Sequence, residues 1–274
     1  MSESVVWEQK LKNRIKSKYP KIKILETNVA PKNRASSPKL LIVLGGDGTI
    51  LEATRKFEKW DPLILGLNLG HVGFLASVRN KKDFLRGLDK VLKKEYHVTS
   101  KMLIATELIR KNKKIFSGFA LNDVAVQNIL GMVDIGVYVD DHPVQYIKGS
   151  GVLVATATGS TAYNLSAHGP IVMPDIKCFI ITEIMDHNIP TPSLVVKYER
   201  NIILKIEDFR QKDQFVIKET GEASDVVLSV DGGSIVALQK GDKIIIKKSE
   251  RLARFVELEK NYFFKSLQEK LAFK

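Results

Sequence analysis

The sequence predicts an α/β N-terminal domain with a parallel sheet, followed by a mainly β domain. Two apolar runs of strand length, Leu40 to Leu44 and Leu63 to Leu67, each precede a stretch with helical spacing of apolar residues. Fully apolar strands that alternate with helices are typical of a parallel sheet covered on both faces. From about Lys101 the pattern changes to short alternating segments separated by turn residues, which favours β structure.

The first 38 residues predict a helix, a short strand and a loop. The spacing of Val6, Leu11 and Ile15 favours the helix, and the apolar run Ile22 to Leu25 favours the strand. Proline, serine and asparagine then cluster between Pro31 and Pro38, which predicts the loop.

The rest of the first domain is expected to repeat one pattern. The strands Leu40 to Leu44 and Leu63 to Leu67 alternate with helices expected from about Ile50 to Lys59 and around Asp83 to Lys93. Because strand, helix, strand and helix follow in turn, the two strands should run parallel.

The second domain should consist mainly of short strands, and the chain should end in a helix that packs back on the first domain. The expected strands include Leu103 to Ile109, Ile135 to Val139, Leu194 to Val196, Ile202 to Ile206 and Val226 to Val230. The apolar stripe of the terminal helix is expected at Phe255, Leu258, Phe264, Leu267 and Leu271. We therefore expect one domain over residues 1–100, joined by residues 250–274, and a β-rich domain over residues 101–249.

Composition narrows the class of protein. The chain of 274 residues has 43 Lys and Arg against 31 Asp and Glu, a net charge of +12; this excess fits either a solvated surface or a binder of anions. The lysines are scattered without interleaved aromatic residues, which argues against nucleic acid. No apolar run approaches the roughly 18 residues of a membrane span. The single cysteine, Cys178, cannot form an intrachain disulfide and fits a buried thiol in the cytoplasm.

A glycine-rich turn follows the first apolar strand. Leu44 leads into Gly45, Gly46, Asp47, Gly48 and Thr49, and then into the expected helix. Glycines at such a turn let the backbone approach a phosphate, and amides at a helix N-terminus bind anions. Thr49 and Glu52 have the spacing of a capping box, which predicts that the helix begins just after this loop.

Asp47 is the unusual residue of this turn, because a carboxylate repels phosphate unless it has a chemical task. In phosphoryl transfer it could orient the attacking hydroxyl and accept its proton, or help to hold Mg²⁺. The structural alternative is a glycine turn in which Asp47 caps the helix. The sequence contains neither the G-x-x-x-x-G-K-[ST] motif of P-loop NTPases nor a G-x-G-x-x-G motif of Rossmann dehydrogenases after a strand.

A strand that leads into the sequence GGDGT, residues 45–49, resembles the motif of a kinase superfamily. This superfamily groups NAD kinases with 6-phosphofructokinases and with diacylglycerol and sphingosine kinases. Residues 151–172 favour the NAD kinases, because Thr158 to Tyr163, with the sequence TGSTAY, resembles the glycine-rich signature of that family. Three further segments agree: Leu67 to Leu75, Leu121 to Val124, and Asp231 with Gly232.

The resemblance implies an ATP-dependent NAD kinase with named site residues. Gly45, Gly46, Gly48 and Thr49 would bind the ATP phosphates, and Asp47 would be the catalytic base. NAD would contact a larger set of residues: Asp47, Gly48, Phe74, Asn122, Asp123, Ser150, Thr158, Thr161, Ala162, Tyr163 and Ser166. Mg²⁺ would arrive with ATP, since the five histidines lack metal-ligand spacing and no protein metal site is expected. The family also implies a homodimer or homotetramer.

The chemistry of the residues supports these roles independently. In Asn122-Asp123 an amide and a carboxylate lie side by side, which suits base edges and a ribose diol, although an Asx turn is the structural alternative. The hydroxyls of Thr158, Ser160 and Thr161 can donate hydrogen bonds. Tyr163 offers a flat face for a ring of the dinucleotide, although on its own it would more often be a core residue.

The chain departs from the family pattern at several positions. The family has an acid where this chain has Ser150, proline where it has Ala157, glycine where it has His168, and a Cys-Pro-His segment where it has Glu183 to Pro192. We interpret these as changes near the nicotinamide and the subunit contact. A lipid or sugar kinase and a non-catalytic dinucleotide sensor remain alternatives, and the preferences for NAD or NADH and for ATP or polyphosphate stay open.

Overall fold

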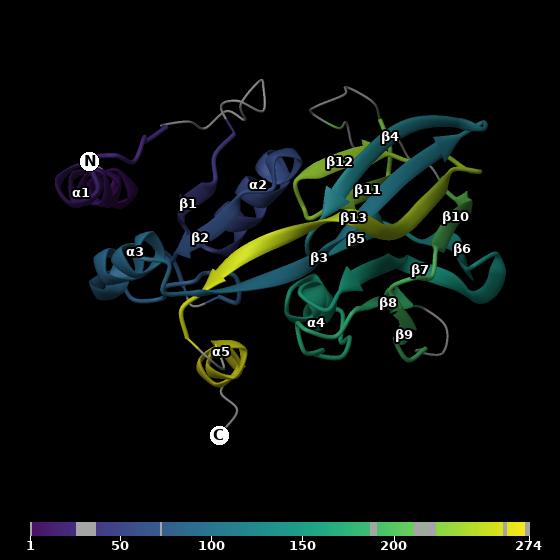
Figure 1. The fold of residues 1–274 in the computed structure, drawn as a ribbon. Coiled ribbons are helices and arrows are strands. Elements are labelled where there is room, and N and C mark those ends of the chain that lie inside the picture. Colours follow the sequence, from purple (N-terminus) through teal and green to yellow (C-terminus); the bar gives the residue numbers. More distant parts are fainter. Residues whose placement is uncertain are drawn as a thin grey trace. The chain divides into compact units, whose positions relative to one another are not determined.

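The computed structural model describes residues 2–25, 37–71, 73–186, 191–210, 217, 223–259 and 262–271. The chain divides into two compact units (Figure 1). Unit 1 is Met1–Lys101 with Arg251–Lys274, and unit 2 is Met102–Glu250. The boundaries fall inside strands β3 (His97–Arg110) and β13 (Lys243–Glu257), so each of these strands has residues in both units.

Unit 1 contains the expected parallel strands. Strand β1 (Leu40–Leu44) pairs with β2 (Leu63–Leu67) in parallel, with Leu41 opposite Ile64, and the helix α2 (Asp47–Phe57) connects them. On the other side of β2 the end of β13 adds a further parallel strand, with Phe255 opposite Ile64. Since β1, β2 and the end of β13 run the same way, the carboxyl ends of β1 and β2 lie at one edge.

The core of unit 1 forms between this sheet and two helices. Helix α1 (Glu3–Lys18) buries Leu11 and Ile15, as its spacing predicts, and α3 (Phe84–Leu92) buries Phe84 and Leu88. These side chains join Leu65 and Leu67 of β2 in one apolar cluster. The sheet therefore gives the turn after β1 a rigid base.

Unit 2 consists mainly of antiparallel strands. They are β4 (Lys113–Ala120), β5 (Asp123–Asn128), β6 (Val133–Val139), β7 (His142–Thr156), β8 (Cys178–Asp186), β9 (Leu194–Lys197), β10 (Ile202–Phe209), β11 (Val226–Val230) and β12 (Ser234–Ala237), with a short helix α4 (Tyr163–Ser166). Pairing follows the order β13, β10, β6, β7, β5, β11, β12; β8 pairs with β7 and β9, and β3 with β4. All of these pairs are antiparallel where the register is resolved.

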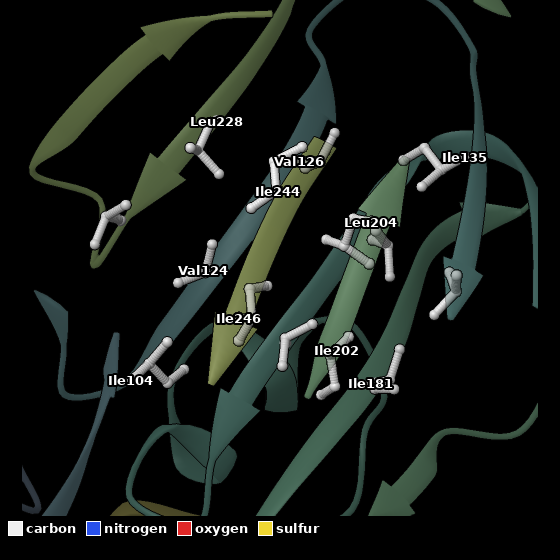
Figure 2. Close-up of a cluster of buried hydrophobic side chains, with 14 of the residues drawn as sticks. Ile104, Val124, Val126, Ile135, Ile181, Ile202, Leu204, Leu228, Ile244 and Ile246 are labelled. Atoms are coloured by element: carbon white, nitrogen blue, oxygen red, sulfur yellow. The ribbon is translucent and has the colours of Figure 1, made fainter. Parts of the chain in front are cut away.

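Alternation along these strands builds one apolar core. The inward residues of β10, Ile202, Leu204 and Ile206, are fully buried, whereas the residues between them are half-buried. Figure 2 shows how side chains from β3, β5, β6, β8, β10, β11 and β13 meet in this cluster. The strands that carry the candidate site of unit 2 therefore rest on a packed interior, which fixes their ends.

Three details differ from the expectations. Ile22 to Leu25 do not form a strand: Ile22 and Leu25 are exposed and lack the apolar burial that would favour pairing. Helix α2 begins at Asp47 with Gly46 as its N-cap, so Thr49 lies inside the first turn and forms no capping box.

The terminal helix is shorter than expected. Helix α5 spans Tyr262–Leu271 and belongs to unit 1, as predicted, but Phe255 lies in β13 and Phe264 is 51% exposed. Ser266 is the buried residue of this helix, and polar contacts hold it. The predicted apolar stripe is therefore wrong for Phe255 and Leu258, which precede the helix, and for Phe264, which is exposed.

Some expectations fall on residues that the structure does not describe. Residues 31–36 of the expected loop and residues 187–190 of the divergent segment lie outside the described ranges. Within those ranges, none of the helices has both the length and the apolar composition that a membrane span needs.

Candidate active site

The glycine turn of unit 1 presents the N-terminus of α2 at the carboxyl end of β1. The N–H of Gly45 donates to the Leu67 carbonyl at 3.1 Å, which ties the turn to the end of β2. The amides of Gly48 and Thr49 lie in the first helical turn, where backbone N–H groups have no carbonyl partner within the helix. Gly46 and Gly48 face open space, since an added Cβ would meet no atom within 4 Å. The turn can therefore accept an anion at its surface.

Asp47 is the first residue of α2, and its carboxylate is fixed by a neighbouring loop. The amides of Phe74 and Leu75 donate to its two oxygens at 2.7 and 3.2 Å. Gly73 lies directly against the carboxylate, because a Cβ at that position would be 2.2 Å from Oδ1. Because a carboxylate can accept about four hydrogen bonds, the two from these amides leave further acceptor positions for a ligand. The structure thus orients Asp47 without using up its hydrogen-bonding capacity.

The C-terminal helix in turn holds this loop. The Ser266 hydroxyl donates to the Gly73 carbonyl at 3.1 Å, and Arg79 donates to the Ser266 oxygen at 2.6 Å and to the Tyr262 carbonyl at 2.7 Å. The Phe74 ring lies 5.8 Å from the ring of Phe263, measured between centroids. Sequence reasoning missed Arg79 and Ser266, because their role depends on contacts between residues almost 200 positions apart.

A buried lysine of unit 1 adds positive charge near Asp47. Lys101 is buried, with its Nζ 5.7 Å from the centroid of the Phe255 ring. Burial lowers the pKa of Lys101 to about 8, and the charges of Glu257 and Asp47 oppose this fall. Glu257 itself accepts a short hydrogen bond from Thr99. Sequence reasoning missed Lys101, which no motif marks.

In unit 2 the Asn122-Asp123 pair lies at the start of β5, where an aspartate from another turn holds its backbone. Asp231, between β11 and β12, accepts hydrogen bonds from the amides of Leu121 and Asn122, each at 2.8 Å, and of Asp123 at 3.1 Å. The pair is therefore not an Asx turn closed by its own side chains; a remote carboxylate sets its geometry.

Asp123 is a buried carboxylate with unused acceptor capacity. Its side chain accepts no hydrogen bond from the residues that the structure describes. Burial, together with the nearby negative charge of Asp231, raises the pKa of Asp123 to about 7. Because buried polar groups are nearly always paired, this carboxylate is suited to a ligand that brings donors.

The predicted glycine-rich signature packs against this pair. Gly159 lies against the backbone of Asn122, since a Cβ would be 2.2 Å from its carbonyl oxygen. The Thr156 hydroxyl donates to the Leu121 carbonyl at 2.6 Å and accepts from the Gly159 amide at 3.1 Å. The structure therefore brings the two predicted NAD-binding segments of unit 2 together.

Within this signature the hydroxyl residues have different tasks. Ser160 is fully buried, and its hydroxyl donates to the Ala157 carbonyl at 2.7 Å, so it holds the turn. Thr158 precedes the 3₁₀ turn Gly159–Thr161 and Thr161 ends it; both are buried, with 3.4 Å between the Thr161 hydroxyl and the Thr158 carbonyl. Ser160 therefore stabilises the loop, while the hydroxyl of Thr161 makes only a long hydrogen bond within it.

The remaining candidates of unit 2 surround Tyr163, the first residue of α4. Its ring packs on an apolar cluster, and Gln127 makes a short hydrogen bond to its hydroxyl. Gln127 pairs with Gly151, the neighbour of the half-buried Ser150. Ala162 is half-buried and Ser166 exposed at the end of α4. Tyr163 thus combines the core role with an accessible edge.

One family departure has a local cost. His168, where the family has glycine, adopts a left-handed conformation with φ of 61°. Histidine tolerates this region better than most residues do, although glycine would adopt it without strain. His168 therefore holds a backbone conformation here that glycine would adopt more easily.

The predicted residues thus form two groups. Gly45, Gly46, Asp47, Gly48, Thr49 and Phe74 lie in unit 1, and Asn122, Asp123, Ser150, Thr158, Thr161, Ala162, Tyr163 and Ser166 lie in unit 2. Within the described ranges, no three His, Cys, Asp or Glu side chains gather as a metal site would require.

Comparison with known proteins gives consistent matches over both units. Residues 1–96 match the ATP-NAD kinase N-terminal domain, and residues 121–258 match the ATP-NAD kinase C-terminal domain. An NAD kinase of Carboxydothermus hydrogenoformans is 38% identical over 235 residues, which cover 85% of this chain and 79% of the relative. An NAD kinase of Lachnospira eligens is 32% identical over 238 residues, covering 86% and 81%.

Solved structures agree with these matches. An NAD kinase from Archaeoglobus fulgidus in complex with ATP superposes with a TM-score of 0.78 at 27% identity, covering 98% of this chain and 96% of that one. Yeast NADH kinase complexed with NADH gives a TM-score of 0.76 at 27% identity. The match covers 86% of this chain but only 66% of the yeast protein.

Proposed function

Since the chain belongs to the ATP-NAD kinase family, we infer that it is an ATP-dependent NAD kinase, which transfers the γ-phosphoryl group of ATP to the 2'-hydroxyl of the adenosine ribose of NAD. Both family domains match, and relatives more than 30% identical bear the name NAD kinase.

The observation that carries the mechanism is the carboxylate of Asp47. It lies at the N-terminus of α2, where amides favour a phosphate, and two loop amides hold it in one orientation. In this assignment Asp47 orients the 2'-hydroxyl and accepts its proton as the phosphoryl group arrives. The amides of Gly46, Gly48 and Thr49 bind the phosphates of ATP, while Gly45, whose amide is bound to Leu67, shapes the turn.

Mg²⁺ is proposed to enter with ATP. Asp47 offers one hard oxygen donor with free lone pairs, which fits a cation that keeps phosphate and water as its other ligands. When bound, Mg²⁺ neutralises phosphate charge. Lys101, whose pKa is lowered to about 8 by burial, adds a positive charge near Asp47 below that pH.

The dinucleotide is assigned to the residues of unit 2. Asn122 and Asp123 offer an amide and a buried carboxylate, which accepts no hydrogen bond within the described ranges, for the base and hydroxyl groups. Thr158, Thr161, Ala162, Tyr163 and Ser166 line the adjoining signature, and Phe74 of unit 1 belongs to the proposed NAD set. Ser150 precedes Gly151, which pairs with Gln127, and we assign Ser150 to the nicotinamide end of NAD.

A coupled assay tests this function. Purified protein is incubated with Mg²⁺, ATP and NAD, and an NADP-specific dehydrogenase reports NADP. Parallel reactions replace NAD with NADH, a diacylglycerol or a sugar phosphate, and replace ATP with polyphosphate. NADP formation supports the proposal; transfer of label only to a lipid or sugar would point to another kinase of the superfamily, and NAD binding without turnover to a sensor.

Gly73→Ala should lower kcat about tenfold or more, because the added methyl displaces the Asp47 carboxylate, and misplacing a catalytic group by about 1 Å can cost 10²-fold. The KM for NAD should change little. Gly70→Ala is the matched control in the same loop, since its Cβ would make only ordinary contacts at 3.8 Å or more. Equal kcat values in both variants would contradict the positioning role of Gly73.

Ser150→Asp should lower the KM for NAD⁺ several-fold and leave kcat nearly unchanged, as expected for uniform binding. The new carboxylate would attract the positively charged nicotinamide ring, so NADH should gain nothing. Because salt screens the charge term, the gain should shrink as ionic strength rises.

The control is Ser150→Asn, which keeps the shape of Asp without its charge. If both dinucleotides improve equally, hydrogen bonding or loop order explains the gain instead of charge. If neither improves, Ser150 lies outside the site.

We further propose that the enzyme is a cytoplasmic homodimer or homotetramer. Unit 2 exposes large apolar side chains, including Leu130, Tyr146 and Met185, that a subunit contact would cover. The lone thiol of Cys178 is buried, as suits a reducing compartment. Light scattering on the purified protein would give the mass of the assembly.

A further inference from the structure

One carboxylate of unit 2 binds the backbone of the Asn122-Asp123 pair from a distant part of the chain. Asp231 Oδ1 accepts from the amides of Asn122 and Asp123, and Oδ2 accepts from the amide of Leu121. The Asp231 amide returns a hydrogen bond to the Asp123 carbonyl at 3.0 Å. Four hydrogen bonds therefore join the two segments, and three of them are accepted by the Asp231 side chain.

The conformation of Asp231 suits this contact. Its φ is 50°, a left-handed value that aspartate adopts more readily than most residues, and Gly232 follows with φ of 64°. The resulting turn between β11 and β12 projects the carboxylate back toward the start of β5. Strained backbone of this kind persists where surrounding contacts fix it, which here are the amides of residues 121–123.

We propose that Asp231 is a positioning residue of the dinucleotide site: through the backbone of residues 121–123 it fixes where the Asn122 and Asp123 side chains meet NAD. The inference rests on the proposed function, because it assumes that these side chains bind the dinucleotide. Asp231 itself acts through its neighbours and touches no substrate.

The electrostatics of the site support this role and supply a test. Burial, together with the charge of Asp231, raises the pKa of Asp123 to about 7. The titratable groups that face Asp123 are Asp231 from the β11–β12 turn and Tyr163 from α4, whose own pKa is raised by burial and by Asp123. An ionised Asp123 accepts hydroxyl donors better than a protonated one, so NAD affinity should rise with pH through about 7.

The experiment measures the Kd for NAD by calorimetry from about pH 5 to about pH 9 for wild type and two variants. Asp231→Ala removes every acceptor for the three amides and should weaken NAD about tenfold or more at high pH. Asp231→Asn keeps one acceptor oxygen and removes the charge. It should weaken NAD less, and the midpoint of its pH dependence should move to lower pH because Asp123 ionises more easily.

The control is Asp208→Asn, which removes one negative charge from an exposed ion pair with Lys240 in the same unit. It should leave the Kd and the midpoint unchanged. Thermal unfolding checks that each variant is folded, and a folded Asp231→Asn suffices if Asp231→Ala is not.

Two results would overturn the inference: a Kd within twofold of wild type in Asp231→Asn at about pH 9, where Asp123 is ionised in both proteins, or an unmoved midpoint. Failure of the proposed function is distinguishable, because the wild-type protein itself would then bind no NAD at any pH. If the wild type binds NAD and Asp231→Asn has the same Kd and midpoint, the positioning role of Asp231 is rejected while the proposed function stands.

Discussion

Asp47→Asn should bind NAD as tightly as the wild type and lose about 10²-fold or more of kcat. The amide keeps the shape of the carboxylate, but it cannot accept the proton of the 2'-hydroxyl. A loss of this size corresponds to about 2.7 kcal/mol of transition-state stabilisation. Steady-state kinetics with the NADP-specific dehydrogenase, together with calorimetric NAD binding, separate the two effects.

Asparagine at position 47 cannot accept both of the hydrogen bonds that the aspartate accepts. Both Asp47 oxygens accept amides, from Phe74 and from Leu75, so asparagine must turn an N–H₂ group toward one donor. Asp47→Ser removes the carboxylate with a smaller side chain, and it should lose kcat to a similar extent. A kcat within threefold of wild type in both variants would eliminate Asp47 as the base.

Asp123→Ala should raise the KM for NAD more than tenfold and change kcat much less. A carboxylate that accepts hydroxyl donors stabilises ground state and transition state alike, and each such charged bond contributes roughly 1.5 to 3 kcal/mol. An unchanged KM for NAD with an altered KM for ATP would reassign the Asn122-Asp123 pair to the phosphoryl donor.

The same variant should be more stable than the wild type at high pH. The folded pKa of Asp123 is raised to about 7 from an ordinary value of 3.8, so its contribution to stability is present below pH 4 and is lost as pH rises through 7. Asp123→Ala removes the ionisable group, so this loss of folding stability at high pH should disappear. Asp123→Asn serves as the control of similar size. Melting temperatures at several pH values should therefore show variants that lose NAD affinity yet gain stability above pH 7.

Much of the fold can be predicted from local patterns. Leu40 to Leu44 and Leu63 to Leu67 are apolar throughout, as expected for parallel strands that are buried on both faces. The first run forms β1 and the second forms β2. Val226 to Val230 match β11 at both ends, where turn residues stop the pairing. Such elements are specified by residues within a few positions of one another.

The errors arise where distant contacts decide. Thr49 has capping-box spacing, yet α2 begins at Asp47, whose side chain bonds to amides 27 and 28 residues away instead of its own helix. Ile22 to Leu25 have strand character, but Ile22 and Leu25 are exposed, whereas Ile24 packs against the apolar cluster of unit 1 without forming a strand. In α5 a buried Ser266 with polar partners replaces the expected apolar contact of Phe264.

The candidate site divides in the same way. Motifs mark the residues that can meet ligands, such as Asp47, Asp123 and Tyr163, because their side-chain chemistry is visible in sequence. Asp231 was noticed only as part of a turn, and Arg79 was missed. Both act on backbone groups more than 100 residues away, which no local pattern encodes.

The central claim is phosphorylation of NAD at one hydroxyl, and ³¹P NMR of the dinucleotide product tests it most directly. The wild-type protein with Mg²⁺, ATP and NAD should give a single new monoester resonance that coincides with authentic NADP, and Asp47→Asn should give almost none in the same time. A monoester at another position of the dinucleotide, or no dinucleotide monoester while ATP is consumed, would contradict the account.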